Sequence, residues 1–417
     1  MHRLPFFYGW VVLAAGGMGM FFSGPGQTYV VSIFVDPMLN DLGWSRTLYA
    51  GLYTGGTITA ATLVPVVGKM LDRYGGRVML VAVSLIFGVA IQLMRFVDEP
   101  LQLFFGFLAI RALGQGSLGL ISTTLAAMWF VRMRGRAMAF MALASPASQA
   151  AFPMLTFFLI AAVGWRSAWG VLGLIVWIAL VPTGVFLVRR SPEAIGMLPD
   201  GDRRTAEGAS DRPGDSRSQD WTLGEAVRTR SFWLLLIAGS SLSMISTALA
   251  FHHISLMVSK GLGAGMAAGV LSFTAPIALV GTFLGGFLAD KLPNRFLLAA
   301  GQVGLLMTML WVLNVSEAWE AFAYGGIMGL TQGTIMTVTN VIWPNYFGRA
   351  HIGSIRGVAS SAMVASSALG PLPFGFIFDR TGDYNVAILA FLGLPIACAA
   401  LSLLARPPVK RLVAAGR

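Results

Sequence analysis

Long apolar stretches, separated by short polar connections, follow one another along almost the whole chain. A run of roughly 20 apolar residues is long enough to cross the hydrocarbon core of a bilayer as a helix. The pattern therefore predicts an all-α integral membrane protein with twelve transmembrane helices. The predicted segments lie near 7–35, 45–67, 78–96, 101–130, 137–162, 167–188, 231–258, 265–288, 296–315, 320–346, 354–378 and 386–405.

A polar stretch interrupts this pattern between the sixth and seventh segments. PDGDRRTAEGASDRPGDSRSQD (199–220) is charged and rich in Gly, Ser and Pro. Because such a composition cannot bury a core, it indicates a disordered linker. WTLGEAVRTR (221–230) follows as a short interfacial helix. We expect three parts: a six-helix half over 1–190, a cytoplasmic linker over 191–230 and a second six-helix half over 231–417.

Composition places much of this surface against lipid. Charged residues make up 11% of the chain and hydrophobic residues 56%, with a mean hydropathy of +0.73. A soluble domain carries about 25% charged residues, so the chain has too few to cover its surface in water. The lipid bilayer is therefore its expected surroundings.

The net charge of +11 has a topological explanation, so we expect no nucleic-acid partner. Positive residues accumulate on the cytoplasmic side of membrane proteins. If the N-terminus is cytoplasmic, 23 of the 29 Lys and Arg residues lie on that side and five on the other. The sequence predicts a multi-pass protein of the bacterial inner (plasma) membrane with both termini in the cytoplasm.

Motifs of enzymes and cofactor sites are missing from the sequence. Cys398 is the only cysteine, which excludes an internal disulfide and argues against a cysteine metal site. There is no Walker loop and no HExxH. We expect no enzymatic activity, no cofactor and no bound metal, and we expect a monomer.

Two similar stretches point to a duplication. GKMLDRYGGR (68–77) follows the second segment, and GFLADKLPNR (286–295) follows the eighth, 218 residues later. Gln115-Gly116 and Gln332-Gly333 recur 217 residues apart. In folds built from such repeats, the substrate site forms between the halves near the middle of the bilayer.

GxxxDRxGxR after the second segment, its second copy and the six-plus-six layout resemble the major facilitator superfamily. FYGWVV (7–12) and DPMLNDLGWSR (36–46) further resemble its bacterial monocarboxylate-porter-like branch. The resemblance implies a twelve-helix transporter working by alternating access. It assigns a cytoplasmic gate to Asp72, Arg73, Arg77 and Asp290, although these residues also fit a loop that only sets topology.

Arg111 is the one basic residue predicted deep inside a segment, where an ionisable group indicates function by default. Its guanidinium can hold a carboxylate through two hydrogen bonds, and Gln115 lies one helical turn along on the same face. Alternatively, Arg111 braces neighbouring helices by bonding to carbonyls. The sequence leaves both roles open.

Uncharged polar residues supply further candidates. Tyr29 follows the break Gly24-Pro25-Gly26 in the first segment, and such breaks are tolerated only beside protein or water. Gln332 and Asn340 lie in the tenth segment. We take these three, with Arg111 and Gln115, as the substrate-binding candidates.

His252 and His253 lie in the outer third of the seventh segment. Histidine changes its protonation near neutral pH, so either residue is a candidate for proton coupling. The alternative is an interfacial histidine that reaches the water outside.

No Asp or Glu is predicted deep in any segment, which disfavours organic cations as cargo. We expect a small-molecule substrate, namely a small organic anion similar to a monocarboxylate, with proton coupling open. Monocarboxylate transporters usually carry a basic residue in the eighth segment and often a lysine in the first. In this chain the eighth segment lacks a basic residue, and Gln27-Thr28 stands at the place of the lysine. The alternatives are a larger neutral, aromatic or drug-like solute, and a non-transporting sensor on the same fold.

Overall fold

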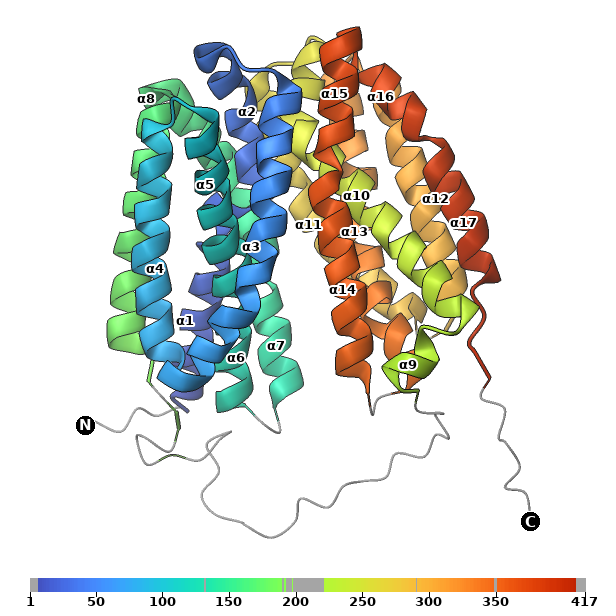
Figure 1. The fold of residues 1–417 in the computed structure, drawn as a ribbon, viewed down its shortest axis with the longest axis horizontal. Coiled ribbons are helices and arrows are strands. Elements are labelled where there is room, and N and C mark those ends of the chain that lie inside the picture. Colours follow the sequence, from blue (N-terminus) through green and yellow to red (C-terminus); the bar gives the residue numbers. More distant parts are fainter. Residues whose placement is uncertain are drawn as a thin grey trace. The chain divides into compact units, whose positions relative to one another are not determined.

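The computed structural model describes residues 7–130, 133–189, 191–192, 197, 221–289, 291–348 and 351–409. Over these ranges the regular elements are helices, without a strand. Long helices run alongside one another within each part of the chain (Figure 1). The expected all-α membrane fold is confirmed.

By their contacts, the helices form two compact units. Unit 1 comprises Met1–Ser210 and Ala250–Ala275, and unit 2 comprises Asp211–Leu249 and Pro276–Arg417. Residues 250–275 belong to the second half in sequence but pack within unit 1. The domain limits expected from the sequence, at 190 and 230, stay a prediction.

The helices of the first sequence half cover the first six predicted segments. They are α1 (Gly9–Phe21), η1 (Gly24–Gly26), α2 (Thr28–Leu42), α3 (Arg46–Tyr74), α4 (Gly76–Leu93), η2 (Met94–Phe96), α5 (Pro100–Ile110), η3 (Arg111–Leu118), α6 (Gly119–Trp129), α7 (Arg134–Ala142), α8 (Ala144–Pro182) and η4 (Thr183–Leu187).

The second half begins with a short helix and then covers the remaining six segments. Its elements are α9 (Leu223–Ala226), α10 (Arg230–Ser259), α11 (Ala264–Ala289), α12 (Asn294–Leu313), α13 (Ala318–Phe347), α14 (Ile352–Leu369), α15 (Pro371–Thr381), α16 (Tyr384–Phe391) and α17 (Gly393–Leu404). The expected interfacial helix is therefore a single turn, α9. Thr222 and Glu225 form a capping box at its N-terminus.

Among the described residues, nine helical runs are long and apolar enough to cross a membrane. This number is consistent with twelve passes. The run Phe140–Leu187 spans 48 residues, and Gly164 interrupts it with a φ of +76°. The first predicted segment is divided between α1 and α2 by the break at Gly24–Gly26.

Glycine allows close backbone packing between α11 and α13 in unit 2. A Cβ at Gly333 would lie 1.9 Å from the carbonyl oxygen of Ala278, and one at Gly281 would lie 2.4 Å from that of Leu330. Helices approach this closely in membranes where small residues face each other.

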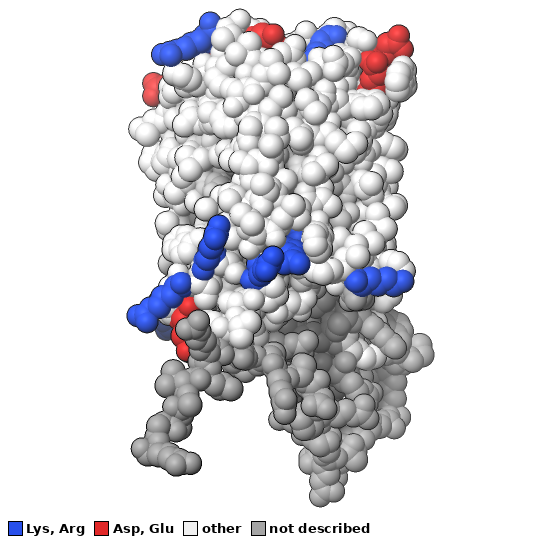
Figure 2. All heavy atoms as spheres, turned by 90° about the vertical axis from the view of Figure 1, so that its right-hand side faces the viewer, with Lys and Arg blue, Asp and Glu red and all other residues white. Residues whose placement is uncertain are grey.

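The surface between the polar ends is apolar. In the face shown by Figure 2, a broad uncharged band separates the zones that carry Lys, Arg, Asp and Glu. Large side chains such as Ile178 and Phe283 are 74% and 72% exposed. Such a band is the surface that a bilayer core covers.

Candidate functional site

Arg111 opens the π-helix η3, in the middle of the fourth predicted segment. Its side chain is only 3% exposed. Nη1 donates to the carbonyl oxygen of Gly26 at 3.0 Å and, more weakly, to Oγ1 of Thr28 at 3.4 Å. The guanidinium carbon lies 5.0 Å from the ring centroid of Tyr53. These partners are a carbonyl, a hydroxyl and an aromatic ring, and none of them is an acid.

The break in the first segment explains this position of Arg111. A 3-10 turn at Gly24–Gly26 interrupts the α-helical ladder, so carbonyl groups there need other donors. A Cβ on Gly26 would lie 2.3 Å from the carbonyl oxygen of Ile110 and 3.0 Å from Cα of Gly114. Glycine therefore brings η1 onto η3, and Arg111 donates a buried hydrogen bond to the carbonyl of Gly26. This geometry supports the bracing role that the sequence left open.

Gln115 does not share the surroundings of Arg111. Its side chain is exposed, whereas that of Arg111 is buried. In η3 the backbone bonds span five residues, as does the bond from the Ser117 hydroxyl to the carbonyl of Ala112. The two side chains differ in burial, and a role of Gln115 in substrate binding stays a prediction.

Tyr29 belongs to a chain of hydrogen bonds inside unit 1. Its hydroxyl donates to Oγ of Ser148 at 2.8 Å, and Ser148 donates to the carbonyl of Phe21 at 2.6 Å. This chain connects α2, α8 and the end of α1. A role of Tyr29 in substrate binding stays a prediction.

Both candidate histidines are buried, with exposures of 1% for His252 and 0% for His253. Nε2 of His253 lies 3.0 Å from the carbonyl oxygen of Ala267 in α11. The ring of His252 packs on Phe251, with centroids 5.0 Å apart. Burial of both rings does not fit a histidine that reaches the water outside, and proton coupling stays a prediction.

The glycine-rich motif is tighter than a loop. Helix α3 continues through Arg73 to Tyr74, and Gly75 alone joins it to α4 with a φ of +81°. Arg73 lies over the ring of Tyr74, and Nη2 of Arg77 donates to the carbonyl of Val185 at 2.8 Å. The side chain of Asp72 and all of Asp290 lie outside the described residues.

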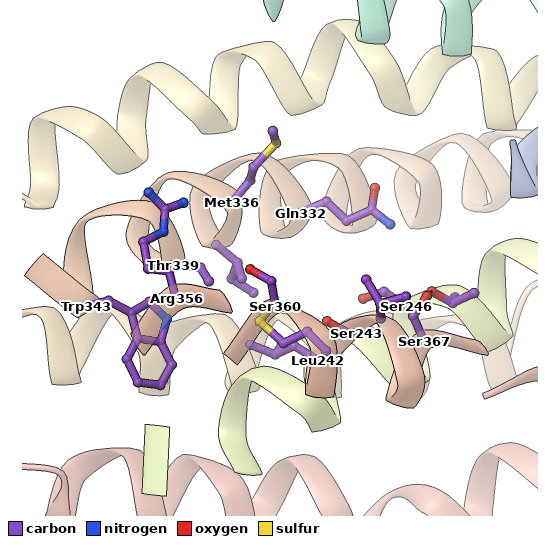
Figure 3. A pocket seen from close by; sticks show the side chains of 14 residues that line it. Leu242, Ser243, Ser246, Gln332, Met336, Thr339, Trp343, Arg356, Ser360 and Ser367 are labelled. Atoms are coloured by element: carbon purple, nitrogen blue, oxygen red, sulfur yellow. The ribbon is translucent and has the colours of Figure 1, made fainter. Parts of the chain in front are cut away.

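Unit 2 contains a pocket of about 440 Å³ between α10, α13 and α14 (Figure 3). Gln332, predicted from the sequence, lines it, while the side chain of Asn340 lies outside the described residues. The lining consists of Leu242, Ser243, Ser246, Thr247, Gln332, Ile335, Met336, Thr339, Trp343, Arg356, Ser360, Met363, Val364 and Ser367.

Polar groups are distributed unevenly in this pocket. Arg356 and Trp343 lie toward one end, and Ser246 and Ser367 toward the other (Figure 3). At the latter end, the hydroxyls of Thr247 and Ser367 are 2.6 Å apart and share a hydrogen bond. The pocket therefore combines one cation, a hydroxyl-rich end and apolar walls.

Most of these polar side chains are missing from the candidates named above. The signal was present, because SSLSMIST (240–247) and SSAMVASS (360–367) are hydroxyl-rich stretches within predicted membrane segments. Only the packing of α10 against α14 brings the two stretches to one cavity.

The chain resembles known proteins over most of its length. The family model "Major Facilitator Superfamily" matches residues 16–313 and 270–417. A probable sulfoacetate transporter of Cupriavidus necator is 26% identical over 341 residues, covering 77% of this chain and 76% of that protein. Monocarboxylate transporter 11 of Mus musculus is 23% identical over 396 residues, covering 92% and 84%.

A solved structure shares the fold. The crystal structure of a bacterial homologue of the human lysosomal transporter Spinster, inward-facing and unoccupied, superposes with a TM-score of 0.73 at 15% identity. The superposition covers 97% of each chain. Together with the family match and the apolar helices, this shows that the chain belongs to the Major Facilitator Superfamily and is a membrane transporter, not an enzyme.

Proposed function

We propose that this transporter carries a small organic anion with a carboxylate or sulfonate group, and that the pocket of unit 2 binds it. Arg356 supplies the positive charge, and Gln332 and the hydroxyl-rich end bind further oxygen atoms. A guanidinium suits this task because its fixed fork of donors can bind two oxygen atoms of one anion.

The charge of the pocket is the observation that carries this proposal. Arg356 is the one ionisable residue among the described residues that line the pocket, and those residues include no Asp or Glu. A pocket for an organic cation would need an acid, because a buried cation requires a counter-charge. The names of the two relatives, for sulfoacetate and monocarboxylate, support the same class of cargo.

In this proposal Arg111 is a brace and does not bind the anion. Its Nη1 already bonds to the carbonyl of Gly26, and its side chain is buried within unit 1. We further propose a plasma-membrane location with both termini cytoplasmic, because Lys and Arg are concentrated on that side.

Calorimetric titration of the purified protein in detergent tests the proposal. Sulfoacetate and lactate are the probes, and lactamide is the uncharged analogue. We expect the anions to bind and Arg356→Gln to raise Kd by about 10- to 100-fold, the loss typical of a charged hydrogen bond. Arg380→Gln is the matched control, because Arg380 lies in α15, stacks on Phe376 at 4.1 Å and does not line the pocket.

A neutral amphipathic solute is the second candidate. Trp343, Met336 and Met363 line the pocket and offer large, adaptable apolar contacts. A volume of about 440 Å³ also exceeds the need of a three-carbon acid. Two results together would replace the first proposal by this one. Neither anion would bind, and aromatic neutral solutes would bind the parent and Arg356→Gln equally well.

A further inference from the structure

A helical hairpin from the second sequence half is attached to the first. Residues 250–275 include the end of α10, the connection to α11 and the start of α11, and they pack in unit 1. We call them the crossing hairpin. One end of unit 1 carries the connections 43–45 and 97–99, and we call it the distal end. The contacts of the crossing hairpin with α2, α3 and α8 lie at this end and farther along the helices from it.

A polar triad joins the crossing hairpin to α2 and α3. Arg46 Nη1 lies 2.7 Å from Oδ1 of Asp36 and donates to Oγ of Ser255 at 2.8 Å. Ser255 in turn donates to the same Oδ1 at 2.7 Å. The Arg46 and Asp36 side chains are 19% and 20% exposed, so water reaches the edge of the triad.

An aromatic contact lies one turn from the triad. The ring of Phe251 is 4.7 Å from that of Tyr53 and 6.0 Å from that of Tyr49, measured between centroids. Tyr53 also packs on Arg111 and shares a hydrogen bond of 2.7 Å with Thr28. The crossing hairpin thus contacts the same ring that covers the buried arginine.

The other side of the crossing hairpin is attached to α8. Gln149 Nε2 donates to Oγ1 of Thr274 at 3.0 Å. The Phe157 ring fills the space beside Gly265, where a Cβ would lie 2.9 Å from it. Both arms of the hairpin are therefore attached to the first sequence half.

Chain continuity gives these contacts a mechanical meaning. Helix α10 enters the hairpin from unit 2 at Leu249, and α11 returns to unit 2 at Pro276. A proline inside a helix lacks one backbone hydrogen bond and makes a bend easier there. Movement of the second sequence half relative to α2 and α3 must therefore break the hairpin contacts or bend these helices.

We propose that Asp36, Arg46 and Ser255 form a latch that attaches the crossing hairpin to α2 and α3 and that opens and closes in each transport cycle. A partly exposed ion pair suits this task, because water replaces its hydrogen bonds at low cost when it opens. The apolar and aromatic contacts beside the triad strengthen the attachment of the crossing hairpin to unit 1. The triad itself sets the register of α10 on α3. The proposal does not depend on which solute is carried.

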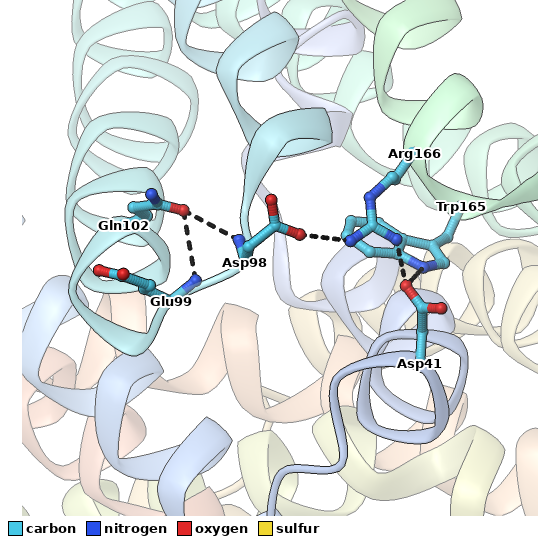
Figure 4. A network of polar contacts seen from close by, with 6 residues as sticks. All are labelled: Asp41, Asp98, Glu99, Gln102, Trp165 and Arg166. Carbon is cyan, nitrogen blue, oxygen red and sulfur yellow. Dashed lines mark hydrogen bonds and ion pairs between the residues drawn. The ribbon is translucent and has the colours of Figure 1, made fainter.

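The structure offers a matched control at the same end of unit 1. Arg166 bonds to the carboxylates of Asp41 and Asp98, and Asp41 also accepts from Nε1 of Trp165 (Figure 4). This second ion-pair cluster joins α2 to the start of α5 and to the turn inside α8. It includes no residue of the crossing hairpin.

Thiol labelling tests the latch in the full-length protein. Cys398→Ala removes the only cysteine, and Ile254→Cys introduces a reporter. Ile254 is 3% exposed and lies on the helix face that carries Phe251 and Ser255. The rate of alkylation by a maleimide then reports how often the hairpin separates from its neighbours.

We expect Arg46→Gln and Asp36→Asn each to raise the labelling rate by about five- to tenfold, in line with the typical strength of such contacts. Arg166→Gln should leave the rate unchanged. The exchange Asp36→Arg with Arg46→Asp should restore slow labelling, whereas Asp36→Arg alone should not. This rescue separates a specific ion pair from a general loss of packing.

Two outcomes would overturn the proposal. One is a parental labelling rate in Arg46→Gln protein that elutes as a single species on size exclusion. The other is an equal acceleration by Arg166→Gln, which would indicate general loosening of the distal end. Should Ile254→Cys itself fail to fold, Ala268→Cys in the other arm of the hairpin, 0% exposed, replaces it as reporter.

Discussion

Arg111 donates a hydrogen bond across 3.0 Å to the backbone carbonyl of Gly26, which lies 85 residues earlier in the chain. The bond joins a π-helix of the fourth segment to the break in the first. Both irregularities sit where their backbones touch, since Gly26 and Gly114 have no side chains to keep them apart. The buried cation thus supports two distorted helices at their contact.

Arg111→Lys tests this bracing role. Lysine keeps the charge but has a compact ammonium in place of the planar fork, so the bond to Gly26 is lost or distorted. We expect the variant to fold, with a lower maximal transport rate and an unchanged Kd for the transported anion. Proteoliposome uptake and calorimetry measure the two quantities. A Kd that rises at least tenfold would return Arg111 to the substrate site.

Gly26→Ala should be poorly tolerated. The added Cβ would lie 2.3 Å from the carbonyl oxygen of Ile110, and this backbone atom cannot rotate away. Overpacking of this kind costs about 1–3 kcal/mol or more. We expect a lower Tm in detergent. Gly119→Ala is the control, because nothing lies within 4 Å of its Cβ position. An equal Tm for both variants would contradict the close contact.

The second ion-pair cluster predicts a simple pH dependence. The bond from Arg166 lowers the pKa of Asp41, at the end of α2, below its ordinary value. A carboxyl group whose pKa is lower in the folded state stabilises that state. The stabilisation is complete above the pKa of the unfolded state, about 3.9, and is lost as the pH falls through the pKa of the folded state. The Tm difference between the parent and Asp41→Asn should therefore be constant from about pH 5 to 8 and shrink below about pH 4. A difference that changes near neutral pH would contradict this origin.

Asp72→Asn tests the gate that the glycine-rich motif implies. The sequence predicts that Asp72 accepts backbone hydrogen bonds at the start of a neighbouring helix, and a carboxylate does so more strongly than an amide. We expect slower turnover with little change in substrate affinity, measured by uptake and calorimetry. Lys69→Gln is the matched control, as an exposed charge in the same motif. Unchanged turnover in Asp72→Asn would leave the motif with a topological role.

The pattern of apolar runs was sufficient to predict the helical membrane fold and the break at Gly24–Gly26. These features depend on local properties, namely the length of each run, its hydropathy and the conformations open to Gly and Pro. The motif at 68–77 was likewise sufficient to indicate the superfamily, because its residues are contiguous in the chain.

Other features needed the packed structure. Arg111 was recognised as unusual from sequence, but its partner Gly26 depends on how two distant helices cross. The π-helix that begins at Arg111 has no clear sequence signal, since one changed hydrogen-bond register produces it. The pocket around Arg356 and the latch at Arg46 bring together residues from three helices each. Hydropathy determines which segments enter the membrane, whereas side-chain fit between helices selects which polar groups meet there.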